Sequence, residues 1–193
     1  MNKFRRLMSV LPLLAISLAA AAGGRPAYAG QSPQNASQTS TAGSPLIDKV
    51  RAATARFKDI NVATSEGWVQ ATPCVSGPDT GAMGVHFVMP SRINNFVLQA
   101  DKPQALIYEP LPGGEFRLVG VEFIVLAGVW QGQPTGATST PALEGDLLNY
   151  IGAPNRYGLP AFYEMHVWAW EDNPKGSFAD WNTHVTCEKQ AAN

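Results

Sequence analysis

The sequence lacks the short motifs that identify common catalytic and metal-binding sites. It has no GxSxG nucleophile turn, no HExxH helix, no phosphate-binding glycine loop, no CxxC pair and no EF-hand spacing. It also has no internal repeat and, beyond its first residues, no apolar run long enough to cross a membrane. Identification by motif is therefore excluded, and the positions of single polar residues become the main guide to a site.

An excess of basic residues is missing as well. The chain has 14 Lys and Arg residues against 15 Asp and Glu residues. Four of the basic residues and none of the acidic ones precede Gly30, so the chain from Gly30 onward has a net charge of −5. Such a chain has no basic stripe with which to neutralise phosphates. We expect no nucleic-acid partner and no attachment to anionic lipid.

The first 29 residues have the pattern of an export signal. Three basic residues precede an apolar run over residues 7–22, and Ala27-Tyr28-Ala29 provides a small-x-small cleavage site. The run is about 16 residues long, shorter than the roughly 20 residues of a membrane span. The sequence therefore predicts a signal peptide over residues 1–29 and a soluble periplasmic or extracellular protein that leaves the membrane after cleavage. An uncleaved anchor is the alternative.

The chain after the signal divides into a linker and one domain. Residues 30–44 contain no charge and no large apolar side chain, so they cannot offset the entropy of ordering and predict a disordered linker. Residues 45–193 are long enough for one domain that buries most of the surface its unfolded chain exposes.

Cysteine is scarce, with Cys74 and Cys187 as the only two. In an oxidising compartment an even pair predicts a disulfide. The bridge closes a loop of more than 100 residues and stabilises by up to roughly 4–5 kcal/mol in the chain-entropy model. A cysteine metal site is a weaker alternative, because it requires CxxC spacing or nearby histidines. A nucleophilic thiol is also weaker, because it requires a neighbouring base.

The hydrophobic pattern predicts one helix followed by strands. Ser44 can cap a helix that starts at Pro45, and apolar residues then recur at steps of three and four. Strand patterns cover residues 83–89, 104–109, 116–130 and 159–170. The predicted fold class is α+β: one N-terminal amphipathic helix packed on an antiparallel sheet of about four strands, with one disulfide.

A long segment rich in Gly, Pro, Ser and Thr, residues 131–160, separates the last two strand patterns. It contains one short helix candidate over residues 141–151. A connection this long inside a small domain is commonly a functional lid or a disordered excursion.

Three polar residues stand in strands that are apolar on both faces: His86, Glu122 and His166. A buried imidazole or carboxylate is costly unless it is paired or bound to a metal. Two imidazoles and one carboxylate can hold a divalent ion with an open position, or a small polar ligand. We expect such a site below residues 131–160, with Glu109 or Glu164 in support. Zinc or copper is the expected ion, because imidazole and carboxylate suit these metals and no thiolate is free.

Strand alternation assigns each of these residues to a face. The expected neighbours on the same face are Gly84 and Val88 for His86, Gly120 and Ile124 for Glu122, and Glu164, Trp168 and Trp170 for His166. Because a metal ligand must be a neutral imidazole, affinity should fall as the pH drops through about 6.5.

The alternative hypothesis is a structural or interaction protein. Its His and Glu residues would form a closed buried network, with Glu122 paired to Arg117 or Lys102, and exposed aromatic residues of the C-terminal segment would form an adhesive surface. Neither hypothesis supplies a catalytic nucleophile, so no enzymatic activity, substrate or oligomeric state is assigned.

Several segments resemble one known family: "MGVHF", "LVGVEF", "HVWAWEDNPKGSFADWN" and the closing "VTC". Their order is similar to that of a family of small exported bacterial proteins with the motifs MGVH, LVGVE, HVW, NPxGxFAxWN and a final cysteine. The resemblance covers most of residues 45–187, implies a single exported domain and gives no substrate. The chain departs from the family at "WNTHV", where the family has proline and arginine at Thr183 and His184, so we discount His184 as a ligand.

Overall fold

The computed structural model describes residues 44–77, 79–134 and 136–190. The predicted signal peptide and nearly all of the predicted linker lie outside these residues, so both remain predictions. None of the described helices is long and apolar enough to span a bilayer.

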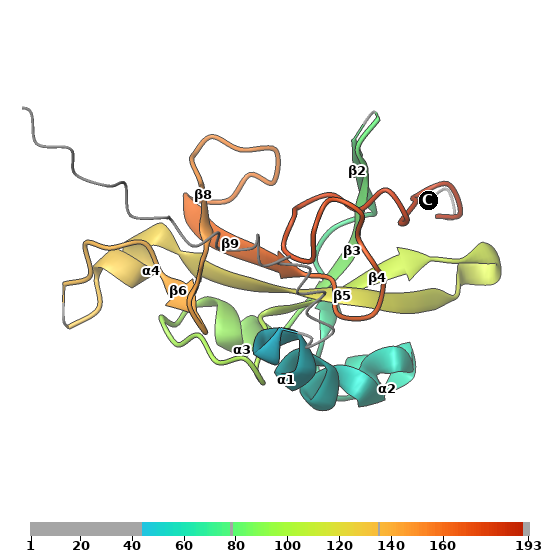
Figure 1. Ribbon diagram of the computed structural model, residues 1–193, viewed down its shortest axis with the longest axis horizontal. Helices are drawn as coiled ribbons and strands as arrows, with labels where there is room; N and C mark the ends of the chain where they lie inside the picture. Colours follow the sequence, from blue (N-terminus) through green and yellow to red (C-terminus); the bar gives the residue numbers. More distant parts are fainter. Residues whose placement is uncertain (1–43, 78, 135, 191–193) are drawn as a thin grey trace, which may run out of the picture. The chain divides into compact units, whose positions relative to one another are not determined.

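An antiparallel sheet of seven strands lies at the centre of the described residues (Figure 1). Six strands follow the order β1, β3, β4, β5, β9 and β8, and β2 pairs with β3 outside this order. The bounds are β1 Val69–Gln70, β2 Val75–Gly77, β3 Gly81–Val88, β4 Ala105–Pro110, β5 Phe116–Leu126, β8 Asn149–Ile151 and β9 Phe162–Val167. The four long strands match the four predicted ones. The sequence estimate omitted β1, β2 and β8, because strands of two or three residues are too short for alternation to be recognised.

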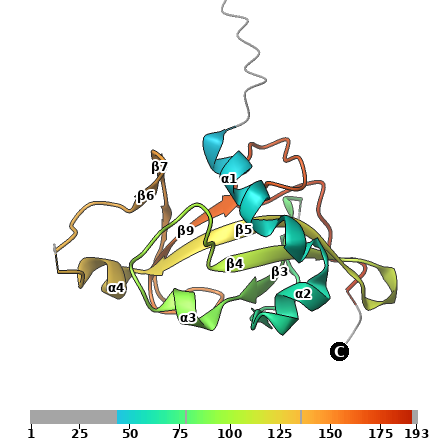
Figure 2. The ribbon, with the colours of Figure 1, turned by 90° about the horizontal axis from the view of Figure 1, so that it is seen from below.

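Helices cover one face of this sheet (Figures 1 and 2). They are α1 Pro45–Thr54, the 3₁₀ turn η1 Ala55–Lys58 and α2 Ile60–Ser65. The single predicted helix is thus interrupted at Asp59, which adopts an extended conformation and accepts a hydrogen bond of 2.9 Å from the Asn61 amide to start α2. Ser44 precedes α1 as predicted, but its side chain makes no capping hydrogen bond.

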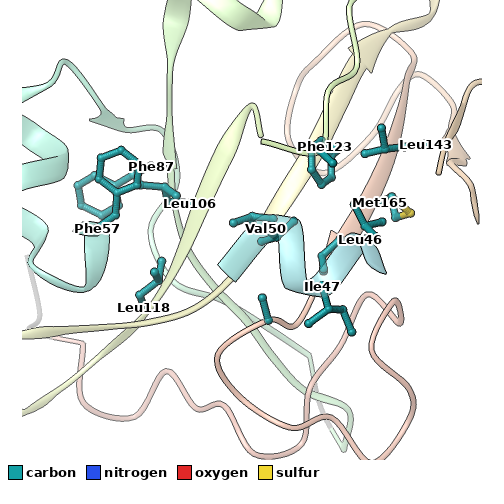
Figure 3. Close-up of a cluster of buried hydrophobic side chains, with 14 of the residues drawn as sticks. Leu46, Ile47, Val50, Phe57, Phe87, Leu106, Leu118, Phe123, Leu143 and Met165 are labelled. Atoms are coloured by element: carbon teal, nitrogen blue, oxygen red, sulfur yellow. The ribbon is translucent and has the colours of Figure 1, made fainter. Parts of the chain in front are cut away.

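The main hydrophobic core lies between these helices and the sheet (Figure 3). Val50 of α1 and Phe57 of η1 belong to the same buried cluster as Leu106 and Phe123 of the sheet. Alternation along β5 therefore directs Phe123 to the helix side. It leaves Glu122 on the opposite face, as predicted.

The C-terminal segment, residues 168–187, crosses that opposite face (Figure 1). It is fixed to the rest of the fold by the Ala82–Asn182 bridge, by a hydrogen bond of 3.0 Å from the Thr186 amide to Glu109, and by the Cys74–Cys187 disulfide. The disulfide, with Cα atoms 5.6 Å apart, confirms the predicted pairing.

Residues 127–151 differ from the sequence prediction. β5 ends at Leu126, and the short helix α4 follows. The predicted helix over residues 141–151 is instead a hairpin followed by β8, because Glu144 and Gly145 have φ angles of 53° and 98°, the positive values of a two-residue hairpin turn. The elements not yet given are α3 Pro90–Ile93, η2 Pro112–Gly114, α4 Ala127–Gln131, β6 Ala142–Leu143 and β7 Asp146–Leu147.

Candidate metal centre

The strand register brings the three predicted residues together on the face that the C-terminal segment crosses. Glu122 on β5 pairs directly with His166 on β9. His86 on β3 is separated from Glu122 by β4, which places Ala105 beside Glu122. His86 pairs with Ile107 of β4, so the side chains of His86 and Glu122 reach diagonally across this strand, with His86 Nε2 3.5 Å from Glu122 Oε2.

All three side chains are buried, with 6% of His86, 5% of Glu122 and none of His166 exposed. Burial lowers the pKa of His86 to about 4. Burial and the neighbouring His86 lower the pKa of His166 to about 3. Burial also raises the pKa of Glu122 well above its ordinary value, and the charge of Glu164 raises it further. Protonation of the two imidazoles is therefore shifted well below the pH of about 6.5 that the sequence suggested. The raised pKa of Glu122 makes its proton a competitor for the ion, so metal affinity is still expected to fall as the pH drops.

Thr72, in the loop before β2, orients the His86 ring. Its Oγ1 lies 3.2 Å from His86 Nδ1 and accepts a hydrogen bond of 3.2 Å from the His86 amide. When Nδ1 carries the ring proton and donates it to Thr72, the Nε2 lone pair is free toward Glu122, as a metal ligand requires. Sequence reasoning missed Thr72, because a hydroxyl in a loop belongs to no recognisable motif.

His166 lacks the hydrogen bonds that a buried imidazole requires. Among the described residues, neither of its ring nitrogens has a hydrogen-bond partner. The ring stacks on Trp168 with an interplanar angle of 18° and meets the ring of His86 edge-on. An unsatisfied buried polar group costs about 1–3 kcal/mol, so two in one ring call for an explanation, and a bound ion supplies one.

Two further carboxylates lie near Nδ1 of His166. Glu164 Oε2 and Asp180 Oδ1 are each 3.9 Å from this nitrogen. Glu164 comes from β9, whereas Asp180 comes from the C-terminal segment and accepts a hydrogen bond of 3.2 Å from Asn149. Burial raises the pKa of both carboxyl groups. Glu164 was expected in support of the site, whereas Asp180 was not among the predicted ligands.

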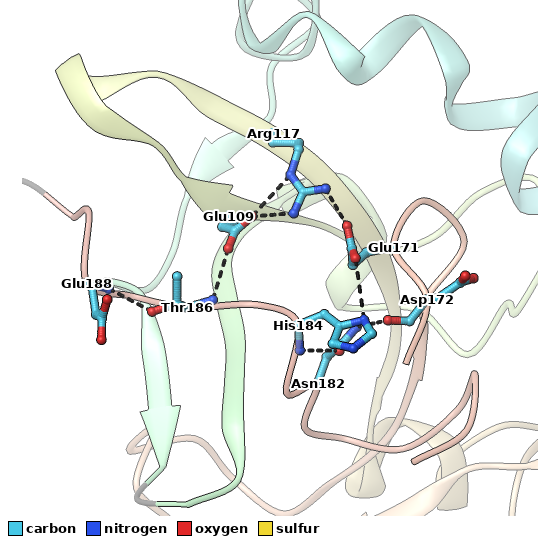
Figure 4. A network of polar contacts seen from close by, with 8 residues as sticks. All are labelled: Glu109, Arg117, Glu171, Asp172, Asn182, His184, Thr186 and Glu188. Atoms are coloured by element: carbon cyan, nitrogen blue, oxygen red, sulfur yellow. Dashed lines mark hydrogen bonds and ion pairs between the residues drawn. The ribbon is translucent and has the colours of Figure 1, made fainter. Parts of the chain in front are cut away.

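Glu109, the other expected supporting residue, belongs to a separate network (Figure 4). Its carboxylate accepts a hydrogen bond of 3.1 Å from Nε of Arg117. Arg117 also contacts Glu171, which lies 3.7 Å from Nδ1 of His184. The prediction that Glu109 supports the metal site is therefore wrong, because its carboxylate is held by Arg117. Arg117 consequently does not neutralise Glu122, and His184 stays outside the site, as expected.

A pocket of about 370 Å³ opens onto His86 and Glu122. This volume falls within the roughly 300–1,000 Å³ of small-molecule sites. Part of its wall comes from the end of the predicted long loop, which matches the expected position of the site below that segment. The pocket is also lined by Thr72, Val88, Ile124, Arg156, Tyr157 and Phe162.

Trp168 and Trp170, which the sequence placed in the last strand, both pack inside the fold. Trp168 is 3% exposed, and its Nε1 donates a hydrogen bond of 2.6 Å to the carbonyl of Ala179. Trp170 packs against the main core and donates a hydrogen bond of 3.1 Å to Thr54 Oγ1. The sequence predicted Trp170 on the same face as His166, and this prediction is wrong. β9 ends at Val167, so the alternation of side chains between the two faces stops before Trp170.

No family model, curated protein or solved structure matches the chain. The site itself consists of buried His, Glu and Asp groups that can hold a metal ion or form an ion-pair network. Two groups each offer three ligand atoms within 4.8 Å of one another: His86, Glu122 and His166, and Glu164, His166 and Asp180.

Proposed function

We propose that this is an exported metal-binding protein in which His86, Glu122 and His166 hold a zinc or copper ion at the floor of the 370 Å³ pocket. The observation that carries the proposal is His166, a fully buried side chain whose two ring nitrogens have no hydrogen-bond partner in the described part of the chain. A closed network would have satisfied those nitrogens.

The distances suit a small ion. Two ligand atoms that each lie about 2.1 Å from one tetrahedral ion are about 3.4 Å apart. His86 Nε2 and Glu122 Oε2 are 3.5 Å apart, so an ion can contact both without further movement. The ligand atom of His166 lies within 4.8 Å of the other two and needs to move inward by at most about 1.4 Å to complete the set.

Three protein ligands leave one position of a tetrahedral ion open. The pocket gives a small molecule access to that position, since His86 and Glu122 form part of its lining. The ion and the small polar ligand that the sequence suggested as alternatives can then occupy one site together, with the ligand bound to the ion.

Export is supported by two features of the chain. The N-terminal residues have the pattern of a signal peptide, and the Cys74–Cys187 disulfide is of the kind that persists in oxidising compartments. The order of the MGVH, LVGVE and HVW motifs supports membership of the family of small exported bacterial proteins. An intact mass of the secreted protein that retains residues 1–29 would contradict the export part of the proposal.

Elemental analysis tests the metal part. We expect protein purified without chelator or affinity tag to contain stoichiometric zinc or copper. His166→Ala and Glu122→Ala should lose most of it, because each leaves only two ligands. His184→Ala removes the remaining histidine of the chain, which is half-exposed and outside the site, and should retain the metal.

The thermal midpoint provides the control on folding. Adding zinc or copper should raise the midpoint of the wild type and of His184→Ala, and not that of His166→Ala. Absence of stoichiometric metal, together with no gain in midpoint on adding either ion, would leave the structural hypothesis standing.

A further inference from the structure

His166 offers a second nitrogen that the proposed ion does not use. Nδ1 is the nitrogen that lies near Glu164 and Asp180. We assign the other nitrogen, Nε2, to the ion held with His86 and Glu122. Both nitrogens are buried, and neither has a hydrogen-bond partner in the described residues. One ion would therefore satisfy only one side of this ring.

We propose a second divalent cation site, formed by Glu164, Asp180 and Nδ1 of His166, so that the His166 ring bridges two ions. This inference rests on the proposed function, because the first ion occupies the other nitrogen. The ring proton is released to water when the second ion binds, and the ring then bridges as an imidazolate.

The spacing of the second group is that of a metal site. Nδ1 of His166 is 3.9 Å from an oxygen of Glu164 and 3.9 Å from an oxygen of Asp180. This separation is too long for a hydrogen bond. Ligand atoms of one tetrahedral ion are about 3.4 Å apart, so each oxygen needs to move inward by about 0.5 Å to share an ion with Nδ1.

The charges of the site also favour two ions. Glu122, Glu164 and Asp180 are all at least partly buried, and no Lys or Arg lies within 4.0 Å of their carboxylates in the described residues. Burial favours the protonated forms of these carboxyl groups in the metal-free protein. Two divalent ions carry four positive charges, which balance the three carboxylates and one imidazolate that form when the protons are released on binding.

A structural role for the same carboxylates makes a different prediction. In that arrangement His166 binds one ion through Nε2, and its Nδ1–H donates a hydrogen bond to Glu164 or Asp180, which only orients the ring. The number of ions bound at saturation separates the two arrangements.

The test is a zinc titration of chelator-stripped, disulfide-intact protein, with bound zinc counted after equilibrium dialysis. We expect two zinc ions in the wild type and one in Asp180→Asn, which keeps an oxygen acceptor for Asn149. Asp172→Asn, an exposed carboxylate of the same segment, is the matched control and should keep two.

Copper gives an independent readout, because two copper(II) ions joined by an imidazolate are magnetically coupled. The wild type should show less paramagnetic resonance intensity than its copper content requires, and Asp180→Asn should show full intensity from one ion. One zinc ion in both proteins would overturn the bridge and leave the proposed function intact. Two zinc ions in Asp180→Asn would place the second ion elsewhere and overturn the bridge as well. Neither zinc nor copper bound in the wild type would overturn both proposals.

Discussion

Each polar residue of the site has its charge state set by its neighbours rather than by its type. Burial removes His86 and His166 from water, which lowers their pKa values and favours the neutral rings. Glu122, Glu164 and Asp180 are crowded together, so burial and mutual repulsion favour their protonated forms in the metal-free protein. Binding a cation reverses this preference, because it stabilises the carboxylates and uses the neutral imidazoles.

A pH prediction follows from the lowered pKa of His166, about 3 against an unfolded value near 6.5. Between these values the unfolded chain binds a proton that the folded chain excludes, so this histidine makes metal-free protein less stable as the pH falls from 6.5 to 4. The carboxyl groups with raised pKa values make the folded protein more stable as the pH falls. The pH dependence of the wild type alone therefore does not report on His166. The comparison with His166→Leu isolates the histidine, because the carboxyl groups remain.

We compare the free energies of unfolding of metal-free His166→Leu and metal-free wild type. As the pH falls from 6.5 to 4, the difference between them should shift by about 3 kcal/mol in favour of His166→Leu. Urea unfolding of both stripped proteins at the two pH values measures this difference. An identical pH dependence of the two proteins would show that folding leaves the pKa of His166 unchanged.

Single residues also show how far the sequence can predict a site. His86, Glu122 and His166 were recognisable, because each stands as a polar exception in an apolar strand. Thr72 and Asp180 were not, because a hydroxyl or carboxylate in a polar loop is unremarkable until the loop is placed over the sheet. Glu109 was recognisable for the same reason as the first three, yet its partner proved to be Arg117.

At the scale of elements, the site depends on which strands are neighbours. Alternation assigned the faces of β3, β5 and β9 correctly, but it carries no information on strand order. The order places β9 beside β5, so that Glu122 and His166 pair directly, and it places β4 under the contact between His86 and Glu122. Pairing between strands distant in sequence is set by the packing of the whole sheet, which is why the sequence left it open.

Gly120 on β5 provides a test of this arrangement. A Cβ atom there would lie 2.8 Å from the carbonyl oxygen of Val167 on β9, so Gly120→Ala must push these two strands apart. We expect a loss of about 1–3 kcal/mol in unfolding free energy. Metal affinity should fall at least about tenfold, since the strands carry Glu122 and His166. Zinc titration and urea unfolding measure the two effects.

Gly128→Ala is the matched control, because nothing lies within 4 Å of a Cβ at that position in α4. It should leave metal affinity unchanged. Unchanged affinity in Gly120→Ala would contradict the dependence of the site on the spacing between β5 and β9.

At the scale of the whole described fold, the main hydrophobic core lies on one face of the sheet and the candidate metal centre lies on the other. The helices bury one face and supply most of the hydrophobic contact, whereas the opposite face combines small apolar clusters with the polar centre. The disulfide spans 113 residues and stabilises by roughly 4–5 kcal/mol in the chain-entropy model. The disulfide joins the loop that carries Thr72 to the segment that carries Asp180. Both residues therefore lie on chain that is covalently fixed near the site.

The α+β class could be predicted because periodicity is a property of the local sequence, and the disulfide could be predicted because the chain has only two cysteines. The path of residues 168–187 across the sheet could not, because that segment has few apolar residues in a regular pattern. It follows its path through particular contacts, such as Trp168 with Ala179 and Asn182 with Ala82. The second group of ligands depends on this path and was therefore missed.

The central claim is that an ion occupies the centre formed by His86, Glu122 and His166. Anomalous diffraction from crystals of untagged protein never exposed to chelator, recorded on both sides of the zinc and copper absorption edges, tests it most directly. We predict an anomalous peak about 2.0–2.2 Å from His86 Nε2, from a Glu122 oxygen and from a ring nitrogen of His166. No peak between these three side chains, or a peak only beside His184, would contradict the claim.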